Sequence, residues 1–125
     1  MADYKIHGQP DNLYAQTVTI ASGASTSEWI APQGKALIGI QMPAAWTAAK
    51  IAINAGVSPN SLGQVYDNAG NRAAVTVAAS EFIAIPLDSA VFAPYLSLSS
   101  VDGSGNPVNQ GQDAVIILLL RRYLS

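Results

Sequence analysis

The side chains in this sequence best suited to bind a ligand are aromatic rings and neutral amides. Carbohydrate sites combine aromatic faces with amide and carboxylate groups that hydrogen-bond to hydroxyls. The sequence supplies both kinds, namely the aromatics Trp29, Trp46, Tyr66 and Tyr95 and the amides Asn54, Asn60, Asn68 and Asn71. One sequence does not show which of these converge. We therefore take a subset in expected rim loops as candidate partner or glycan contacts: Trp46, Tyr66, Asn68 and Asn71. For Trp46 the alternative is simple packing in the core or at its rim.

No residue set indicates catalysis. Hydrolytic or acid–base chemistry needs paired carboxylates, or a nucleophile with a base and an orienting group. His7 is the single histidine and the chain has no cysteine. The acidic residues of the later loops are isolated from one another: Asp67, Asp88, Asp102 and Asp113. We expect a protein that is not an enzyme, with no catalytic residue, no cofactor and no bound metal.

Two loops have a weak resemblance to calcium sites, residues 67–71 and residues 102–106. Calcium takes about six to eight oxygen ligands, often from several carboxylates. Each loop offers one carboxylate with a few neutral oxygens. Both loops are therefore predicted to be tight turns, with Gly70 in the left-handed conformation.

The segments that would position these loops read as short strands. Alternating apolar and polar residues, separated by turn residues, predict about eight or nine short strands and no long helix. The expected strands cover residues 17–22, 28–31, 35–42, 49–54, 64–67, 72–78, 82–87, 95–101 and 113–123. This pattern predicts an all-β, single-domain antiparallel β-sandwich, jelly-roll-like, over residues 15–125, with residues 1–14 as an N-terminal arm or short edge strand.

The most regular part of the chain is residues 35–54, KALIGIQMPAAWTAAKIAIN. Apolar side chains alternate on each side of the loop 43–48, which carries Trp46. These alternating residues are Ile38, Ile40, Met42, Ala49, Ile51 and Ile53. The turn residues 32–34 just before this part predict that residues 28–31 pair with the strand that follows.

Charge is scarce in this sequence. Asp, Glu, Lys and Arg make up 11% of the chain, against about 25% in ordinary soluble domains. The net charge is −2 and the basic residues are scattered, so no nucleic-acid partner is expected. Residues 1–12 lack the features of a secretory signal, and the longest apolar run is too short for a membrane helix. Two interpretations remain, a Ser/Thr-rich sandwich or a subunit whose surfaces are covered by neighbours.

The last expected strand departs from simple alternation. Residues 114–120, AVIILLL, are apolar at both parities. A sheet with one face in water should alternate, so this run predicts that both faces are covered. The cover is either the chain's own domain or a partner subunit. An uncovered face would favour aggregation, with Arg121 and Arg122 as charged residues that oppose it.

Several strings together resemble a family of small proteins from tailed-phage genomes and prophages. They are IGIQMPAAWTAAKIAI (38–53), VYDNAGN (65–71), VTVAAS (75–80) and VNQGQ (108–112), and the likeness runs from about Thr17 to Arg122. Residues 39–49 are its most specific part. The strand order is also similar to galactose-binding, discoidin-like sandwiches, although no sugar or calcium ligand of theirs matches a position here. This sequence departs from the phage pattern in its apolar final strand and low charge.

The resemblance implies a virion structural protein assembled in the host cytoplasm. Together with the composition, it predicts a capsid decoration or cement subunit that packs against the major capsid protein and against its own copies, with a trimer as the expected oligomer. The candidate interface residues are Tyr4, Ile6, Tyr14, Ile117 and Leu119. The alternative is a carbohydrate-binding module of a tail fibre or baseplate, with rim loops around Trp46 and Tyr66.

Overall fold

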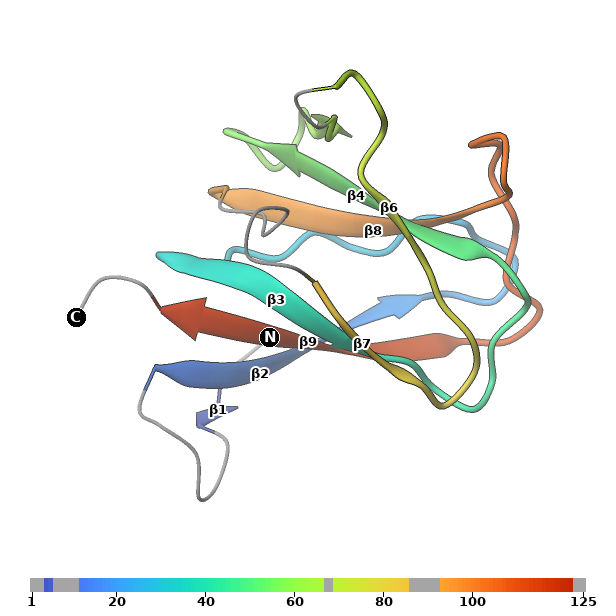
Figure 1. Cartoon of the computed structure of the whole chain (residues 1–125), viewed down its shortest axis with the longest axis horizontal. Coiled ribbons are helices and arrows are strands. Elements are labelled where there is room, and N and C mark those ends of the chain that lie inside the picture. The colour runs from blue at the N-terminus through green and yellow to red at the C-terminus, as the bar shows by residue number, and fades with distance from the viewer. Residues whose placement is uncertain (1–3, 6–11, 67–68, 86–92, 123–125) are drawn as a thin grey trace.

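Two antiparallel β-sheets face each other across a single apolar core (Figure 1). The computed structural model describes residues 4–5, 12–66, 69–85 and 93–122 of the chain. Every regular element in this part is a strand, and each strand pairing is antiparallel. The predicted all-β antiparallel sandwich is confirmed, and its jelly-roll arrangement stays a prediction.

The first layer is a five-stranded sheet in the order β1-β2-β9-β3-β7. Its strands are β1 (Tyr4–Lys5), β2 (Leu13–Ile20), β9 (Ala114–Arg122), β3 (Lys35–Gln41) and β7 (Phe82–Ala84). The final strand lies in the middle of this sheet, between β2 and β3 (Figure 1). β2 begins at Leu13, so the last two residues assigned to the N-terminal arm belong to the sheet.

The second layer is built around β4 (Lys50–Gly56). Strand β8 (Tyr95–Val101) pairs with β4 along its whole length. Two short strands pair with β4 near its two ends. β5 (Gly63–Gln64) pairs with Asn54 and Ala55, and β6 (Ala74–Thr76) pairs with residues 50–52. β3 and β4, which the loop 43–48 connects, therefore lie in different sheets.

Residues 25–30 run beside the remaining edge of β8 instead of forming a strand with β3. The backbone N–H groups of Ser27 and Ile30 donate to the carbonyls of Leu98 and Leu96. The predicted pairing of residues 28–31 across residues 32–34 is therefore wrong. The turn residues are present, with positive φ at Gln33 and Gly34. The chain nevertheless crosses to the other sheet at this turn, because residues 25–30 form their backbone hydrogen bonds with β8, which is distant in sequence.

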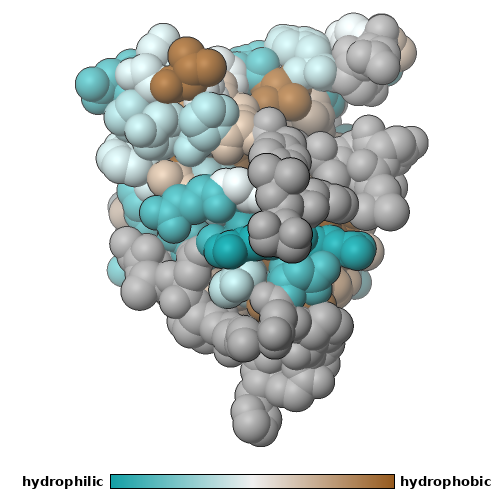
Figure 2. Space-filling view, turned by 90° about the vertical axis from the view of Figure 1, so that its left-hand side faces the viewer, coloured by the Kyte–Doolittle hydropathy of each residue, from teal (hydrophilic) through white to brown (hydrophobic). Residues whose placement is uncertain are grey.

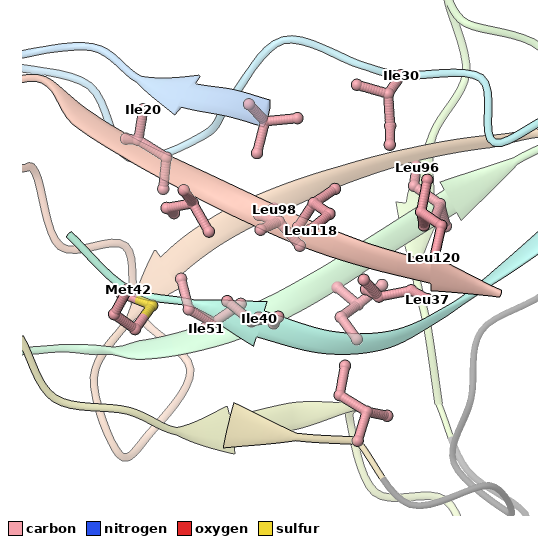
Figure 3. Close-up of a cluster of buried hydrophobic side chains, with 14 of the residues drawn as sticks. Ile20, Ile30, Leu37, Ile40, Met42, Ile51, Leu96, Leu98, Leu118 and Leu120 are labelled. Atoms are coloured by element: carbon pink, nitrogen blue, oxygen red, sulfur yellow. The ribbon is translucent and has the colours of Figure 1, made fainter. Parts of the chain in front are cut away.

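The core between the sheets is made of aliphatic side chains from β2, β3, β4, β8 and β9 (Figure 3). Each fully buried Leu or Ile contributes about 1.5–3 kcal/mol through the hydrophobic effect. The fully buried side chains of this core include Val18, Ile20, Leu37, Ile40, Ile51, Leu96, Leu98, Ile116 and Leu120. The alternation in β2, β4 and β8 therefore predicts the inward-facing residues correctly, whereas the run in β9, apolar at both parities, did not indicate which of its faces is buried.

A bulge in β3 changes which residue of that strand points inward. The pairing with β9 shifts register between Leu37 and Gly39, so Leu37 is fully buried and Ile38 only partly. The prediction that Ile38 shares the inward parity of Ile40 is wrong for this reason, since a bulge adds one residue to the strand. At Gly39 a Cβ atom would lie 2.7 Å from Cζ of Phe82, so the ring of Phe82 occupies the space of the missing side chain.

The two faces of β9 have different surroundings. Leu118 and the other residues of its parity are buried in the core. Val115 and Ile117 on the opposite face are 49% and 37% exposed. The prediction that both faces of this run are covered is therefore not met by the described part of the chain itself.

Candidate functional site

A cavity of about 550 Å³ lies over the outer face of the four-stranded sheet, with polar side chains on its floor and apolar surface from residues such as Trp29 and Leu62 around it. Its floor comes from the residues of β4 and β8 that alternate with the core, above all Asn54 and its cross-strand partner Ser97. Ser99 is the next outward residue on β8. All three are buried although they are polar. They are therefore covered by other parts of the chain without being part of the apolar core.

The polar groups of the floor satisfy one another. Asn54 Nδ2 donates hydrogen bonds to Ser97 Oγ at 3.1 Å and to Ser99 Oγ at 2.9 Å. Thr26 Oγ1 is 2.9 Å from Ser99 Oγ and shares a hydrogen bond with it. The other end of the amide, Asn54 Oδ1, accepts from Arg72 Nη2 at 3.3 Å. A hydrogen-bonded network of this kind holds its side chains in fixed orientations.

Arg72 forms one wall of the cavity and is held there by a hairpin. Its backbone bridges to Tyr66, and Gly70 between them has φ 84°, the left-handed conformation predicted for it. Arg72 Nη1 donates to the carbonyl oxygen of Gly105 at 3.4 Å. Its Nε is buried and has no hydrogen-bond partner among the described residues.

Trp29 supplies the aromatic side of the cavity. Its indole meets the ring of Tyr95 edge to face, with ring centroids 5.3 Å apart and an interplanar angle of 87°. The side chain is nevertheless 48% exposed. The contact with Tyr95 therefore orients the indole and leaves much of it accessible.

The loop after β4 supplies the opposite rim. At Gly56 a Cβ atom would lie 2.6 Å from the carbonyl oxygen of Ser61, so only glycine allows the loop to fold back this tightly. The fold-back brings Asn60 to the cavity, and Gln64 on β5 lies beside it. Gln64 Oε1 also accepts a hydrogen bond from the Tyr66 hydroxyl at 2.9 Å. The rim thus offers two further amides above the floor.

Of the four candidate ligand contacts named from the sequence, the three that the structure describes do not line this cavity. Tyr66 and Asn71 line a neighbouring hollow of about 450 Å³, which shares Gln64 and Arg72 with the cavity. Trp46 lines a third hollow of about 230 Å³ with none of these residues. It packs against the core, and its Nε1 has no partner among the described groups. Asn68 lies outside the described residues.

Of the wider set of aromatics and amides, the structure brings together Trp29, Asn54 and Asn60. Sequence reasoning missed the polar residues that connect them, namely Thr26, Arg72, Ser97 and Ser99. Ser97 and Ser99 do stand at the outward parity of their strand, as Asn54 does on β4. The missing information was that β8 pairs with β4, because strand pairing cannot be read from alternation.

The loop at Asp102 is a turn, as predicted. Asp102 Oδ1 accepts hydrogen bonds from the backbone N–H groups of Ser104 and Asn106, both at 2.9 Å. The bond from Asn106, followed by that from Ser104, lowers the pKa of this carboxyl below its usual 3.8. In the described part of the chain, no group of three or more His, Cys, Asp or Glu side chains could hold a metal ion.

A second surface of interest is the outer side of the five-stranded sheet. We call Phe82, Val115, Ile117 and Leu119 the outer apolar face. Gln41 on β3 pairs with Ile117 on β9 on one side and with Phe82 on β7 on the other. Gly39 on β3 pairs with Leu119 on β9, and the ring of Phe82 packs against Gly39. These side chains therefore come from β7 and β9 and are grouped over β3, which lies between the two strands.

The candidate interface residues fall in different places. Ile117 and Leu119 belong to the outer apolar face. The ring of Tyr14 interacts within the chain, with Lys35 Nζ 4.6 Å and Arg122 Cζ 5.2 Å from its centroid. Tyr4 lies in β1, whose side chains are outside the description, as is Ile6.

The end of the sandwich where β9 terminates has a different character. Figure 2 shows that its coloured surface is mostly hydrophilic, with small and separate hydrophobic patches near the top. This visible end therefore offers no broad apolar surface among the residues that are coloured.

No helix in the described part of the chain is long and apolar enough to cross a membrane. Comparisons with protein-family models, with curated proteins and with solved structures found no match to this chain.

Proposed function

We propose that this chain is a structural subunit of a tailed-bacteriophage virion, a capsid decoration or cement protein. It would assemble in the host cytoplasm and bind non-covalently across neighbouring copies of the major capsid protein, and it would also contact its own copies in a trimer. Binding only to the folded, assembled state stabilises that state by mass action.

The observation that carries this proposal is the outer apolar face. Val115, Ile117 and Phe82 are 49%, 37% and 53% exposed; the first two lie on β9 in the middle of the sheet and Phe82 lies on β7 at its edge, with β3 between the two strands. Exposed apolar groups that are contiguous mark surfaces for protein association. The low content of charged residues supports the same conclusion, because interface cores are depleted in charge.

The occupant we assign to this face is a neighbouring coat subunit. Gln41, Thr17 and Thr19 stand beside the apolar side chains in the same sheet and are neutral. Among the described residues of this face the basic groups do not form a cluster, since Arg121 at the end of β9 is the next residue of this parity, and a nucleic-acid backbone would need several such groups. An apolar and neutral polar protein surface matches both kinds of side chain.

The test is the copy number of the chain in purified virions, measured by quantitative mass spectrometry against the major capsid protein. We expect a copy number comparable to that of the capsid protein. A handful of copies per particle would contradict decoration and place the chain in the tail or neck. Absence from washed particles would contradict a virion role altogether.

The second candidate function is a host-binding, carbohydrate-binding module on a tail fibre or baseplate. The polar cavity with the exposed indole of Trp29 favours it. The site originally expected for this function, around Trp46 and Tyr66, does not form one cavity. Low copy number, together with loss of phage adsorption on Trp29→Ala and unchanged adsorption on Trp46→Ala, would favour this candidate over decoration.

A further inference from the structure

We propose that the cavity over the four-stranded sheet is a binding site for a neutral carbohydrate. Trp29 would stack on the sugar ring, and Asn60, Gln64 and Ser97 would hydrogen-bond to its hydroxyls. This inference concerns a different surface from the outer apolar face, so it holds or fails independently of the proposed decoration function.

The floor of the cavity has the chemistry of a site for a hydroxyl-rich ligand. A loop that merely covers a sheet usually packs apolar side chains onto it, since burial of apolar surface stabilises the fold. Here the covered residues Asn54, Ser97 and Ser99 are polar, and a cavity of about 550 Å³ remains above them. Small-molecule sites have volumes of about 300–1,000 Å³. The floor thus presents hydroxyl and amide groups to a space of suitable size.

The floor is also pre-organised. The two Asn54 hydrogen bonds to Ser97 and Ser99, and the Arg72 bond to Asn54, fix the floor before any ligand arrives. The hydroxyl of each serine carries acceptor lone pairs and a rotatable donor, so it can bond to a ligand hydroxyl in addition. Groups held in place in advance lose little conformational freedom on binding.

The cavity has an aromatic wall. Trp29 lines the cavity, its orientation is set by Tyr95, and about half of its surface is accessible. An indole in this state can stack on the apolar face of a sugar. A structural tryptophan with no ligand would be expected to bury more of its area.

The charge of the lining identifies the class of carbohydrate. The described lining contains one acidic residue, Glu28, and one basic residue, Arg72. Glu28 Oε1 accepts the Thr19 N–H at 3.1 Å, and Arg72 bonds to Asn54 and Gly105. Both charges are therefore engaged within the chain and opposite in sign. A neutral, hydroxyl-rich ligand fits this lining better than a phosphate or a sulfated polymer.

The experiment is a glycan array that displays neutral, amino and acidic oligosaccharides, probed with the full chain and followed by titration of each hit. Trp29→Ala is the main variant. Phe82→Ala is its matched control, because Phe82 is an exposed aromatic of similar accessibility on the other sheet. We expect neutral glycans to bind, with affinity at least about tenfold weaker in Trp29→Ala and within about twofold of wild type in Phe82→Ala.

A second pair of measurements keeps the test decisive if Trp29→Ala fails to fold. In the wild-type chain, the NMR signal of the Trp29 indole N–H should shift on adding a neutral glycan from the array, and that of Trp46 should not. Asn60→Ala, on the exposed rim, should weaken binding at least about threefold. No binding by wild type, binding of acidic glycans only, or binding that survives both Trp29→Ala and Asn60→Ala would overturn the proposal.

Discussion

The outward faces of the two sheets differ in both polarity and exposure to solvent. The face of the five-stranded sheet is apolar along β9 and open, with Val115 and Ile117 exposed. The face of the four-stranded sheet is polar along β4 and β8 and covered, with Asn54 and Ser97 buried under loops. An isolated soluble domain would be expected to show the reverse, polar residues in water and apolar residues under cover.

This difference shows which kind of contact each face can make. The open apolar face gains free energy when any complementary protein surface removes it from water. The covered polar face gains little from burial alone, because its groups already bond to one another, and it offers directional hydrogen bonds instead. The first face therefore suits assembly, and the second suits recognition of a small polar ligand.

The largest expected effect comes from the inner side of β9. Leu118→Ala should lower the free energy of unfolding by about 2–5 kcal/mol, because it leaves a cavity in the core. Val115→Ala on the outer side should lower it by less than about 1 kcal/mol. Urea denaturation of both variants measures the contrast. Equal losses would show that the outer side of β9 is packed within the chain itself.

Breaking the network under the polar cavity should have the next largest effect on stability. Asn54→Ala removes the partner of Ser97, Ser99 and Arg72 and should cost about 1–3 kcal/mol. Asn60→Ala on the exposed rim serves as the control and should stay within about 0.5 kcal/mol of wild type. Thermal and urea unfolding provide the comparison. A neutral Asn54→Ala would mean that the floor is not the rigid network described above.

A charge introduced on the outer apolar face should weaken binding to particles while leaving the stability of the isolated chain nearly unchanged. Ile117→Lys should change the unfolding free energy of the isolated chain by no more than about 1 kcal/mol, because the side chain is partly exposed already. Burying the new charge at a protein interface is costly, so the variant should be displaced from particles, with occupancy at least about tenfold lower.

The matched control for that variant is Val57→Lys, which places the same charge on an exposed loop next to the other sheet. Both chains are mixed with particles that lack the protein, and bound chain is measured by co-sedimentation. Normal binding of Ile117→Lys would remove the outer apolar face from the assembly interface.

The smallest effect concerns the turn at Asp102. Its folded-state pKa is lowered, so ionised Asp102 stabilises the fold above its unfolded value of 3.8, and this contribution is lost as the pH falls through the lowered folded-state pKa. Asp102→Ala should therefore melt at a lower temperature than wild type at neutral pH, and the difference should shrink in acid. A difference that is constant with pH would contradict the carboxylate's part in the turn.

Sequence reasoning reached the fold because alternation and turn residues are local signals. The inward side chains of β2 and β8, the left-handed Gly70 and the Asp102 turn all follow from neighbours within a few positions. The bulge after Leu37 could not be predicted, because it depends on how β3 meets β9. The wrong pairing of residues 28–31 has the same origin, since their partner β8 is more than sixty residues away.

The candidate site was predicted by residue type and not by place. The types of Trp29, Asn54 and Asn60 suit a sugar, but the sequence also offers Trp46 and Tyr66, which lie in loops that the sandwich keeps apart. Cross-strand pairing of Asn54 with Ser97 creates the cavity floor, and pairing between distant strands carries no mark in alternation. The apolar outward residues Ile117 and Leu119 were predictable, because a run that is apolar at both parities has to expose one side or find a partner.

The central claim is that the outer apolar face is covered by other subunits when the chain is in place. The direct measurement is electron microscopy of intact particles at a resolution that shows side chains, with this chain fitted into the density. The account predicts that Val115, Ile117 and Phe82 lie against side chains of neighbouring coat subunits. Particles in which that side of β9 faces solvent, or in which no density fits the chain, would contradict it.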